Sequence, residues 1–314
     1  MVEPIFATSD VPDRRPALGY AMTLSAAALF GIKGTVSKVV LASGLGSLRL
    51  SEIRSTGAAL GLLLGLAVLA PARLRVRGDE LRFFLAFGVL GLTFVQLFYF
   101  LAIHRLPVGI ALLLQYLAPL VVALWARFVM HEPVRRRIWL ALGLALAGLA
   151  GVVQIWNGLA LDGLGVAFAL ASAATFCVYI LLAEHGVRGR DPISVSAFGF
   201  VVSSVFWAAA QPWWSFPGRI VGSDVSLLGR LGGVHLPLWA LTLWVIVLGT
   251  IVPFALIVSA LRHLPATRVG IVAMLEPIAA ALVAWGWLGE DLNAAQLAGG
   301  AIVLAAIGLA QTAR

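Results

Sequence analysis

The chain has 314 residues, of which 61% are hydrophobic and only 11% charged, and its mean hydropathy is +1.01. Soluble globular proteins keep roughly a quarter of their residues charged, so this composition excludes a soluble domain. The apolar residues form blocks of about 20 residues, which predicts an all-α membrane protein. The net charge of +8 does not indicate nucleic-acid binding, because the basic residues cluster between apolar blocks. The single cysteine, Cys177, excludes an intramolecular disulfide.

Ten apolar blocks follow a polar N-terminal tail at 1–17, and each is predicted to be a membrane-spanning helix. We expect the first block to be a retained helix rather than a signal peptide, because no small-residue cleavage site follows it. A long loop at 213–237 contains tryptophans, which favour the membrane surface. The predicted spans are 18–42, 48–70, 81–103, 107–129, 136–155, 163–183, 193–212, 238–260, 265–288 and 293–312.

The arginines predict the orientation of these spans. With a cytoplasmic N-terminus, thirteen arginines fall on the inner side, and Arg49, Arg105, Arg219 and Arg230 fall on the outer side. Inner loops are enriched in basic residues, so both termini are expected in the cytoplasm of a bacterium, with the chain in its inner membrane.

Part of the sequence occurs twice, at a constant offset of 158 residues. Each half contains five spans, an odd number, so the second half must enter the membrane from the opposite side. We therefore predict two inverted five-helix repeats, at 18–155 and 163–312, joined by an outer linker at 156–162. A weaker match, at an offset of 146, relates the first helices of the halves, Ala27-Ala28-x-Phe30 and Ala173-Ala174-x-Phe176. The offset of 158 places Val89-Leu90-Gly91 on Val247-Leu248-Gly249, Leu106-Pro107 on Leu264-Pro265, Pro119 on Pro277 and Glu132 on Glu290.

Several motifs resemble the drug/metabolite transporter superfamily in its EamA-type, ten-helix form: Phe30-Gly31…Lys38, Arg54, Pro119…Glu132 and Leu275-Glu276-Pro277…Gly289-Glu290…Gln296-Leu297-Ala298-Gly299-Gly300. The resemblance implies a transporter whose central cavity is lined by helices 1, 3, 4, 6, 8 and 9. Within that superfamily the chain is most similar to bacterial exporters of amino acids, aromatic ones included, and related metabolites. Phe30 and Lys33 depart from its pattern, which often has Trp and a small polar residue there.

Glu276 is the first candidate for a substrate-binding residue. Counting about 1.5 Å per residue places it about 15 Å into its span, where an ionisable group is costly and usually faces the protein interior. It either binds a substrate amine or takes up a proton during transport, or it is a neutral acid that steadies the helix distortion at Pro277. Lys33 either binds a substrate carboxylate or extends to the outer headgroups. Lys38 and Arg54 are expected near the outer face, as anchors or in contacts between helices 1 and 2.

Other polar and aromatic residues of the apolar helices are candidates for the same cavity. Polar side chains need partners within the membrane, and rings with a few hydrogen-bonding groups suit a partly apolar zwitterion, although each ring can equally be an interfacial anchor. Glu132 and Glu290 are expected to cap their own helices or pair with the next one. Prolines inside helices remove backbone hydrogen bonds and are expected at kinks or hinges. The cavity candidates are Gln96, Tyr99, Gln115, Tyr116, Tyr179, Trp244 and Thr250, and the hinge candidates are Pro119, Pro253 and Pro277.

No metal-ligand cluster, phosphate-binding lysine loop or paired catalytic groups occur in the sequence, so we expect neither an enzyme nor a cofactor. The predicted function is a secondary transporter that exports amino acids, preferably aromatic or hydrophobic ones, and related metabolites by alternating access. The alternatives are an exchanger of phosphorylated or nucleotide-linked metabolites on the same fold, a membrane enzyme, or a channel. The expected partners are the lipid bilayer and a small-molecule substrate, with a monomer or weak homodimer as the oligomeric state.

Overall fold

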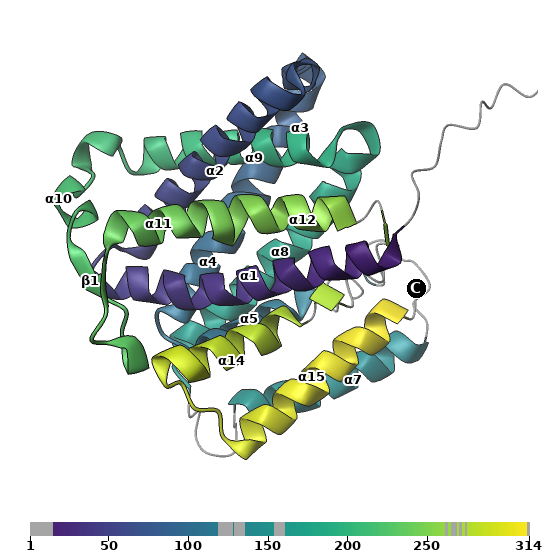
Figure 1. Cartoon of the computed structure of the whole chain (residues 1–314). Helices are drawn as coiled ribbons and strands as arrows, with labels where there is room; N and C mark the ends of the chain where they lie inside the picture. Colours follow the sequence, from purple (N-terminus) through teal and green to yellow (C-terminus); the bar gives the residue numbers. More distant parts are fainter. Residues whose placement is uncertain are drawn as a thin grey trace, which may run out of the picture.

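The computed structural model describes residues 15–118, 136–153, 161–260 and 275–312, together with residues 128, 263, 264, 269, 272 and 273. Within these ranges the chain is a bundle of helices (Figure 1). Six helical stretches there are long and apolar enough to cross a membrane, and shorter apolar helices accompany them. The first half contains α1 (Pro16–Ala42), α2 (Ser47–Leu69), η1 (Pro71–Leu74), η2 (Gly78–Glu80), α3 (Leu81–Ala86), η3 (Phe87–Thr93), α4 (Phe94–Ile103), α5 (Val108–Gln115) and α7 (Arg136–Val153).

The second half contains an equivalent series of helices and one small hairpin. Its elements agree with the predicted spans to within two residues at most ends. The exceptions are α8, which continues six residues beyond the predicted end at 183, and α14, which begins at 276 in the span predicted at 265–288, most of whose first ten residues lie outside the described residues. They are α8 (Gly163–Gly189), α9 (Pro192–Ala210), η5 (Trp213–Ser215), α10 (Gly218–Val221), β1 (Asp224–Ser226), η6 (Gly229–Leu231), β2 (His235–Pro237), α11 (Leu238–Ile246), η7 (Val247–Ile251), α12 (Val252–Ala260), α14 (Glu276–Leu288) and α15 (Ala294–Thr312).

Several helix ends follow directly from the local sequence. The Asp162 carboxylate accepts the backbone N–H of Gly165 at 2.6 Å and so caps the first turn of α8. Asp191 caps α9 in the same way, and Pro192 occupies the first helical position, where no N–H is needed. At the C-terminal end of α14, Gly289 adopts φ +72°, a left-handed conformation that glycine takes without penalty.

Two helices contain a π-helical segment at equivalent places in the two halves. The segment η3 joins α3 to α4, and η7 joins α11 to α12. The shared Val-Leu-Gly motif lies in both, at 89–91 and 247–249. In each segment a threonine hydroxyl donates to the carbonyl five residues earlier, Thr93 to Gly88 and Thr250 to Val245. A π-helical turn holds one more residue than an α-helical turn, so both halves carry one extra residue at this place.

The helices pair across the two halves. Three close pairs join equivalent helices, α2 with α9, α5 with α14, and α7 with α15. The helix α1 packs on α12 and α14, and its equivalent α8 packs on α4 and α5. Figure 1 shows α1 between α12 and α14, and α7 beside α15. This is the pairing that two inverted five-helix repeats related by a two-fold axis produce.

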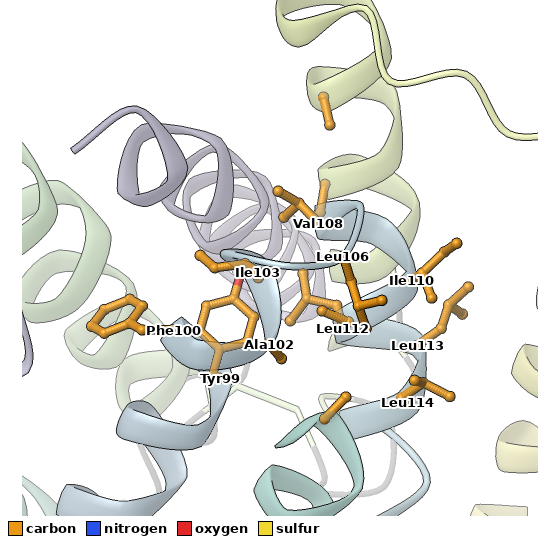
Figure 2. Packing of buried hydrophobic residues seen from close by; sticks show 14 of the residues in the cluster. Tyr99, Phe100, Ala102, Ile103, Leu106, Val108, Ile110, Leu112, Leu113 and Leu114 are labelled. Atoms are coloured by element: carbon orange, nitrogen blue, oxygen red, sulfur yellow. The ribbon is translucent and has the colours of Figure 1, made fainter. Parts of the chain in front are cut away.

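The largest hydrophobic cluster surrounds the turn between α4 and α5. Phe100, Ile103, Leu106 and Ile110 are almost completely buried there. Figure 2 shows how side chains from the end of α4 and the start of α5 gather beside the neighbouring helices, with Tyr99 pointing toward α1. Burying such side chains stabilises the fold by roughly 1.5–3 kcal/mol each. This core therefore fixes the polar side chains that α4 and α5 carry.

The helices α7 and α15 approach each other through glycines. A Cβ atom built on Gly299 would lie 2.6 Å from the carbonyl oxygen of Gly148, and one built on Gly148 would lie 2.7 Å from that of Gly299. Only glycine permits this distance between the two backbones. By contrast, a Cβ on Gly143, on the same helix α7, would meet no atom within 4 Å.

Candidate functional site

Three ionisable side chains from separate helices lie inside the bundle, near enough for their charges to interact. Lys33 of α1 is 7% exposed and Arg54 of α2 is 3% exposed. Glu276, the first residue of α14, is half-buried. The charges of Arg54 and Glu276 both act on Lys33, so the three groups form one electrostatic cluster. Charges inside a membrane protein are costly, and they usually mark a substrate or ion pathway.

Glu276 contacts one of the predicted polar residues directly. The Tyr116 hydroxyl donates to Oε2 of Glu276 at 2.7 Å, which joins α14 to the turn after α5. The Tyr116 ring also lies 6.3 Å from the ring of Phe176 on α8. The hydrogen bond orients the Glu276 carboxylate, whose other oxygen, Oε1, accepts no hydrogen bond from the described residues. Glu276 and Tyr116 were both predicted from the sequence, and the structure places them together.

Lys33 points into the protein rather than toward the lipid headgroups. Its Nζ lies 5.1 Å from the centre of the Phe30 ring and 5.4 Å from that of Tyr99, distances at which a cation is attracted by an aromatic face. Its aliphatic stem packs on Gly249 of η7, where a Cβ would lie 2.8 Å from Cγ. The alternative that Lys33 extends to the outer headgroups is therefore wrong, because its side chain is enclosed.

Arg54 was expected to be an anchor or to make a contact between helices 1 and 2, and this expectation is wrong, because its side chain contacts η7 and α9. Its Nε donates to the hydroxyl of Thr250 in η7 at 3.1 Å, and its guanidinium lies 5.3 Å from the centre of the Phe200 ring. Its Nη1 is buried without a hydrogen-bond partner. The helix α2 turns Arg54 inward against η7, a packing that depth along the sequence does not reveal. The signal for this residue was its position as the seventh residue of an apolar span, where ionisable groups are usually functional.

The remaining cavity candidates occupy different surroundings. Gln96 and Tyr99 of α4 are buried, and their Nε2 and hydroxyl lack hydrogen-bond partners. Tyr179 lies within electrostatic range of Arg54 and stacks on Phe176. Two candidates are not brought to the charged groups in the described part of the chain. These are Gln115, half-buried at the end of α5, and Trp244, which packs at the edge of the main hydrophobic cluster.

The hinge candidates that the structure describes lie at helix starts. Pro277 lies in the first turn of α14, where its missing N–H costs nothing, and it follows a turn residue, Leu275, and helical residues at 272 and 273. Pro253 is the second residue of α12, the helix that directly follows the π-helical segment η7. Pro119 lies outside the described residues. A hinge role for any of the three stays a prediction.

A comparison with known proteins identifies the family. The model of the EamA-like transporter family matches this chain twice, at residues 17–154 and 163–312. The chain belongs to the EamA-like transporter family. It is thus a multi-span membrane transporter of the drug/metabolite transporter superfamily, as the resemblance implied.

Two kinds of curated relative match most of this EamA-like chain. It is 32% identical over 258 residues to the threonine/homoserine exporter RhtA of Salmonella typhimurium, covering 82% of this chain and 80% of that protein. The RhtA protein of Escherichia coli K12 is 30% identical over 261 residues, with the same coverage. An uncharacterised transporter of Archaeoglobus fulgidus is 29% identical and covers 88% of this chain and 91% of its own. A crystal structure with 20% identity, a TM-score of 0.54 and coverage of 91% and 96% has the same fold.

At one end of this EamA-like bundle, hydrogen bonds of Glu290 connect the two halves. Glu290, just beyond α14, accepts hydrogen bonds from Lys38 Nζ on α1 and, at 3.0 Å, from the backbone N–H of Val108 at the start of α5. Lys38 also donates to the Leu106 carbonyl at 3.1 Å. Glu290 was expected to cap its own helix or pair with the next one, and Lys38 to be an anchor or to make a contact between helices 1 and 2. Both expectations are wrong, because the partners are 252 residues apart. Glu132, the equivalent of Glu290, lies outside the described residues.

The hairpin of β1 and β2 covers the same end of the bundle. The Trp287 indole N–H of α14 donates to the Leu227 carbonyl at 2.7 Å, and a Cβ on Gly229 would lie 2.5 Å from Cα of Leu288. Figure 1 shows this segment wrapping the ends of α11 and α14. Nearby, Arg49 donates to the Gln211 carbonyl at 3.1 Å. The loop at 213–237 is therefore packed on the helices and not free.

At the opposite end of the bundle, an arginine connects the two halves. Arg190, after α8, donates to Glu80 at 2.7 Å and to the carbonyls of Arg73 and Arg75 at 2.7 Å each. The backbone N–H of Arg77 and the Arg190 guanidinium lower the pKa of the Glu80 carboxyl. The two ends of the bundle are therefore built alike. Arg49, near the connection between α1 and α2, bonds the Gln211 carbonyl after α9. Arg190, in the connection between α8 and α9, bonds two carbonyls after α2.

Proposed function

We propose that this EamA-like transporter exports amino acids across the bacterial inner membrane by alternating access. The observation that carries the proposal is the buried cluster of Lys33, Arg54 and Glu276. It offers both signs of charge to one ligand, as the carboxylate and ammonium of an amino acid require. The related RhtA proteins, named threonine/homoserine exporters, support the same substrate class.

Alternating access is supported by the pairing of equivalent helices. In an inverted repeat, exchanging the conformations of the two halves converts an outward-open state to an inward-open one. The Glu290 link and the Arg190 contacts join the halves at opposite ends, so each is positioned to open as the other closes. We expect the Arg190 end in the cytoplasm, because the arginines between the apolar blocks are enriched on that side.

The aromatic preference expected from the sequence remains a prediction. The rings beside the charged groups pack largely on one another, since Tyr179 stacks on both Phe176 and Phe87. Threonine and homoserine therefore stand beside the aromatic amino acids as first substrates to test, on the strength of the RhtA relatives.

An exchanger of phosphorylated metabolites is the second candidate. Such a ligand needs at least two buried cations, and Arg54 supplies a second beside Lys33. The Glu276 carboxylate in the same cluster opposes a doubly charged anion, which favours an amino acid.

Uptake and counterflow in proteoliposomes distinguish the two candidates. The panel contains threonine, homoserine, aromatic and branched amino acids, sugars, nucleotides and sugar phosphates. We expect saturable counterflow of at least one amino acid. Exchange of phosphorylated compounds with no response to amino acids would refute the proposed substrate class. Flux without counterflow would indicate a channel and refute alternating access.

A further inference from the structure

Arg54 is a buried cation without a carboxylate partner among the described residues. The ion pairs of that part of the chain involve Lys38, Arg49, Arg73, Arg105 and Arg190, and not Arg54. Its guanidinium makes one hydrogen bond through Nε, while Nη1 faces the interior with no partner. A buried, half-satisfied guanidinium is costly unless a ligand completes it.

The surroundings of Arg54 place it beside the rest of the charged cluster. Arg54 bonds Thr250, and Lys33 packs on the preceding residue, Gly249, so the two cations approach consecutive residues of η7. Gly91 of η3, the equivalent of Gly249, packs in the same way on Tyr179, which is the equivalent of Lys33 at the offset of 146. In each half, the glycine of the π-helical segment thus contacts the side chain at the same place in the first helix of the other half, Lys33 in α1 or Tyr179 in α8.

The charges of the cluster do not balance. Lys33 and Arg54 bring two positive charges and Glu276 brings one negative charge when all three are ionised. Lys33 is already placed against the rings of Phe30 and Tyr99. Neither cation has a carboxylate within ion-pair distance among the described residues, but Arg54 differs from Lys33 in having a fully buried nitrogen, Nη1, without a hydrogen-bond acceptor.

We propose that Arg54 binds the α-carboxylate of the transported amino acid through its free Nη1, and that Thr250 holds the guanidinium in position for this contact. The inference rests on the proposed function and deepens it, because it makes a carboxylate an obligatory part of the substrate. The ammonium of the same zwitterion then faces Glu276, and the net charge of the cluster does not change on binding. A planar guanidinium suits this role because it can donate two parallel hydrogen bonds to a carboxylate.

The test compares each transported amino acid with its amino alcohol, which carries CH₂OH in place of the carboxylate. Both compete against counterflow of the radiolabelled amino acid, and both are assayed by ligand-induced thermal stabilisation of the purified protein. The variants are Arg54→Gln, Arg54→Lys and Thr250→Val. Arg105→Gln is the charge-matched control, because the side chains of the Arg105–Asp162 pair are 42% and 40% exposed.

The wild type and Arg105→Gln are expected to prefer the amino acid over its alcohol by about 10- to 100-fold, the range of a buried charged hydrogen bond. Arg54→Gln is expected to bring this ratio close to one, Arg54→Lys to keep part of it, and Thr250→Val to lower it. A full ratio in Arg54→Gln would overturn the inference. If Arg54→Gln does not purify as a folded protein, an unchanged ratio in Thr250→Val overturns it instead. A wild type that exchanges no amino acid refutes the proposed function itself, a result that is separate from either of these.

Discussion

The link between Glu290, Lys38 and Val108 allows a quantitative prediction for the stability of this transporter. Glu290→Ala removes the acceptor of two hydrogen bonds, one from the Lys38 ammonium and one from the Val108 N–H at 3.0 Å. The two charged side chains are 26% and 15% exposed, so solvent screens the pair only in part. The variant therefore leaves a helix N-terminus uncapped and a partly buried cation with fewer partners.

The expected loss follows from these two contributions. An uncapped helix N-terminus costs about 0.5–2 kcal/mol. A hydrogen bond to a charged group contributes about 1.5–3 kcal/mol, and the lower value applies because Lys38 keeps the Leu106 carbonyl at 3.1 Å. Glu290→Ala should thus lower the free energy of unfolding by about 2–3.5 kcal/mol. Glu290→Gln keeps one acceptor oxygen and should cost about half as much.

A double-mutant cycle with Lys38→Met measures the pairwise part of this energy. Unfolding is followed by tryptophan fluorescence during SDS titration in mixed micelles, with an expected coupling of about 1–2 kcal/mol. The control cycle uses Arg105→Met and Asp162→Asn, an exposed pair that should couple by less than about 1 kcal/mol. A Lys38–Glu290 coupling no larger than this control would refute the reasoning.

Three further outcomes follow from single contacts. Gly299→Ala should lower the free energy of unfolding by about 1–3 kcal/mol, since its Cβ would lie 2.6 Å from the Gly148 carbonyl, whereas Gly143→Ala should be neutral or gain up to about 1 kcal/mol in the same titration. The pKa of Glu80 is lowered from 4.5 in the folded protein, so the contribution of this carboxylate to stability is complete above pH 4.5 and is lost as the pH falls through the folded-state pKa. The difference in unfolding free energy between the wild type and Glu80→Gln should therefore be largest near neutral pH and shrink toward pH 3. A difference that does not depend on pH would contradict this. Glu276→Gln should bind substrate but lose the pH dependence of uptake if this acid couples transport to protons, while an unchanged pH profile with earlier melting would assign it a structural role.

The sequence predicted the helices well and the site only in part. Long apolar blocks mark the spans because the bilayer requires them, so the ends of α1, α2, α9 and α15 fall within two residues of expectation. Lys33, Tyr116 and Glu276 could be selected because charged and polar groups stand out in an apolar helix.

The missed contacts depend on how helices far apart in the sequence cross. Arg54 meets Thr250 across 196 residues, and Lys38 meets Glu290 across 252 residues. Counting depth along one helix gives no information on which neighbour a side chain faces. The π-helical segments were equally hidden, because their composition is that of an ordinary apolar helix.

The paired π-helical segments also bear on the history of the chain. One extra residue in an α-helix would rotate everything beyond it by about 100° and shift it by about 1.5 Å, unless a local widening absorbs the residue. The segments η3 and η7 absorb such a residue at matching positions, within the same Val-Leu-Gly motif. We infer that the extra residue was already present in a single ancestral five-helix unit, because independent insertions would have had to fall at the same place in both halves.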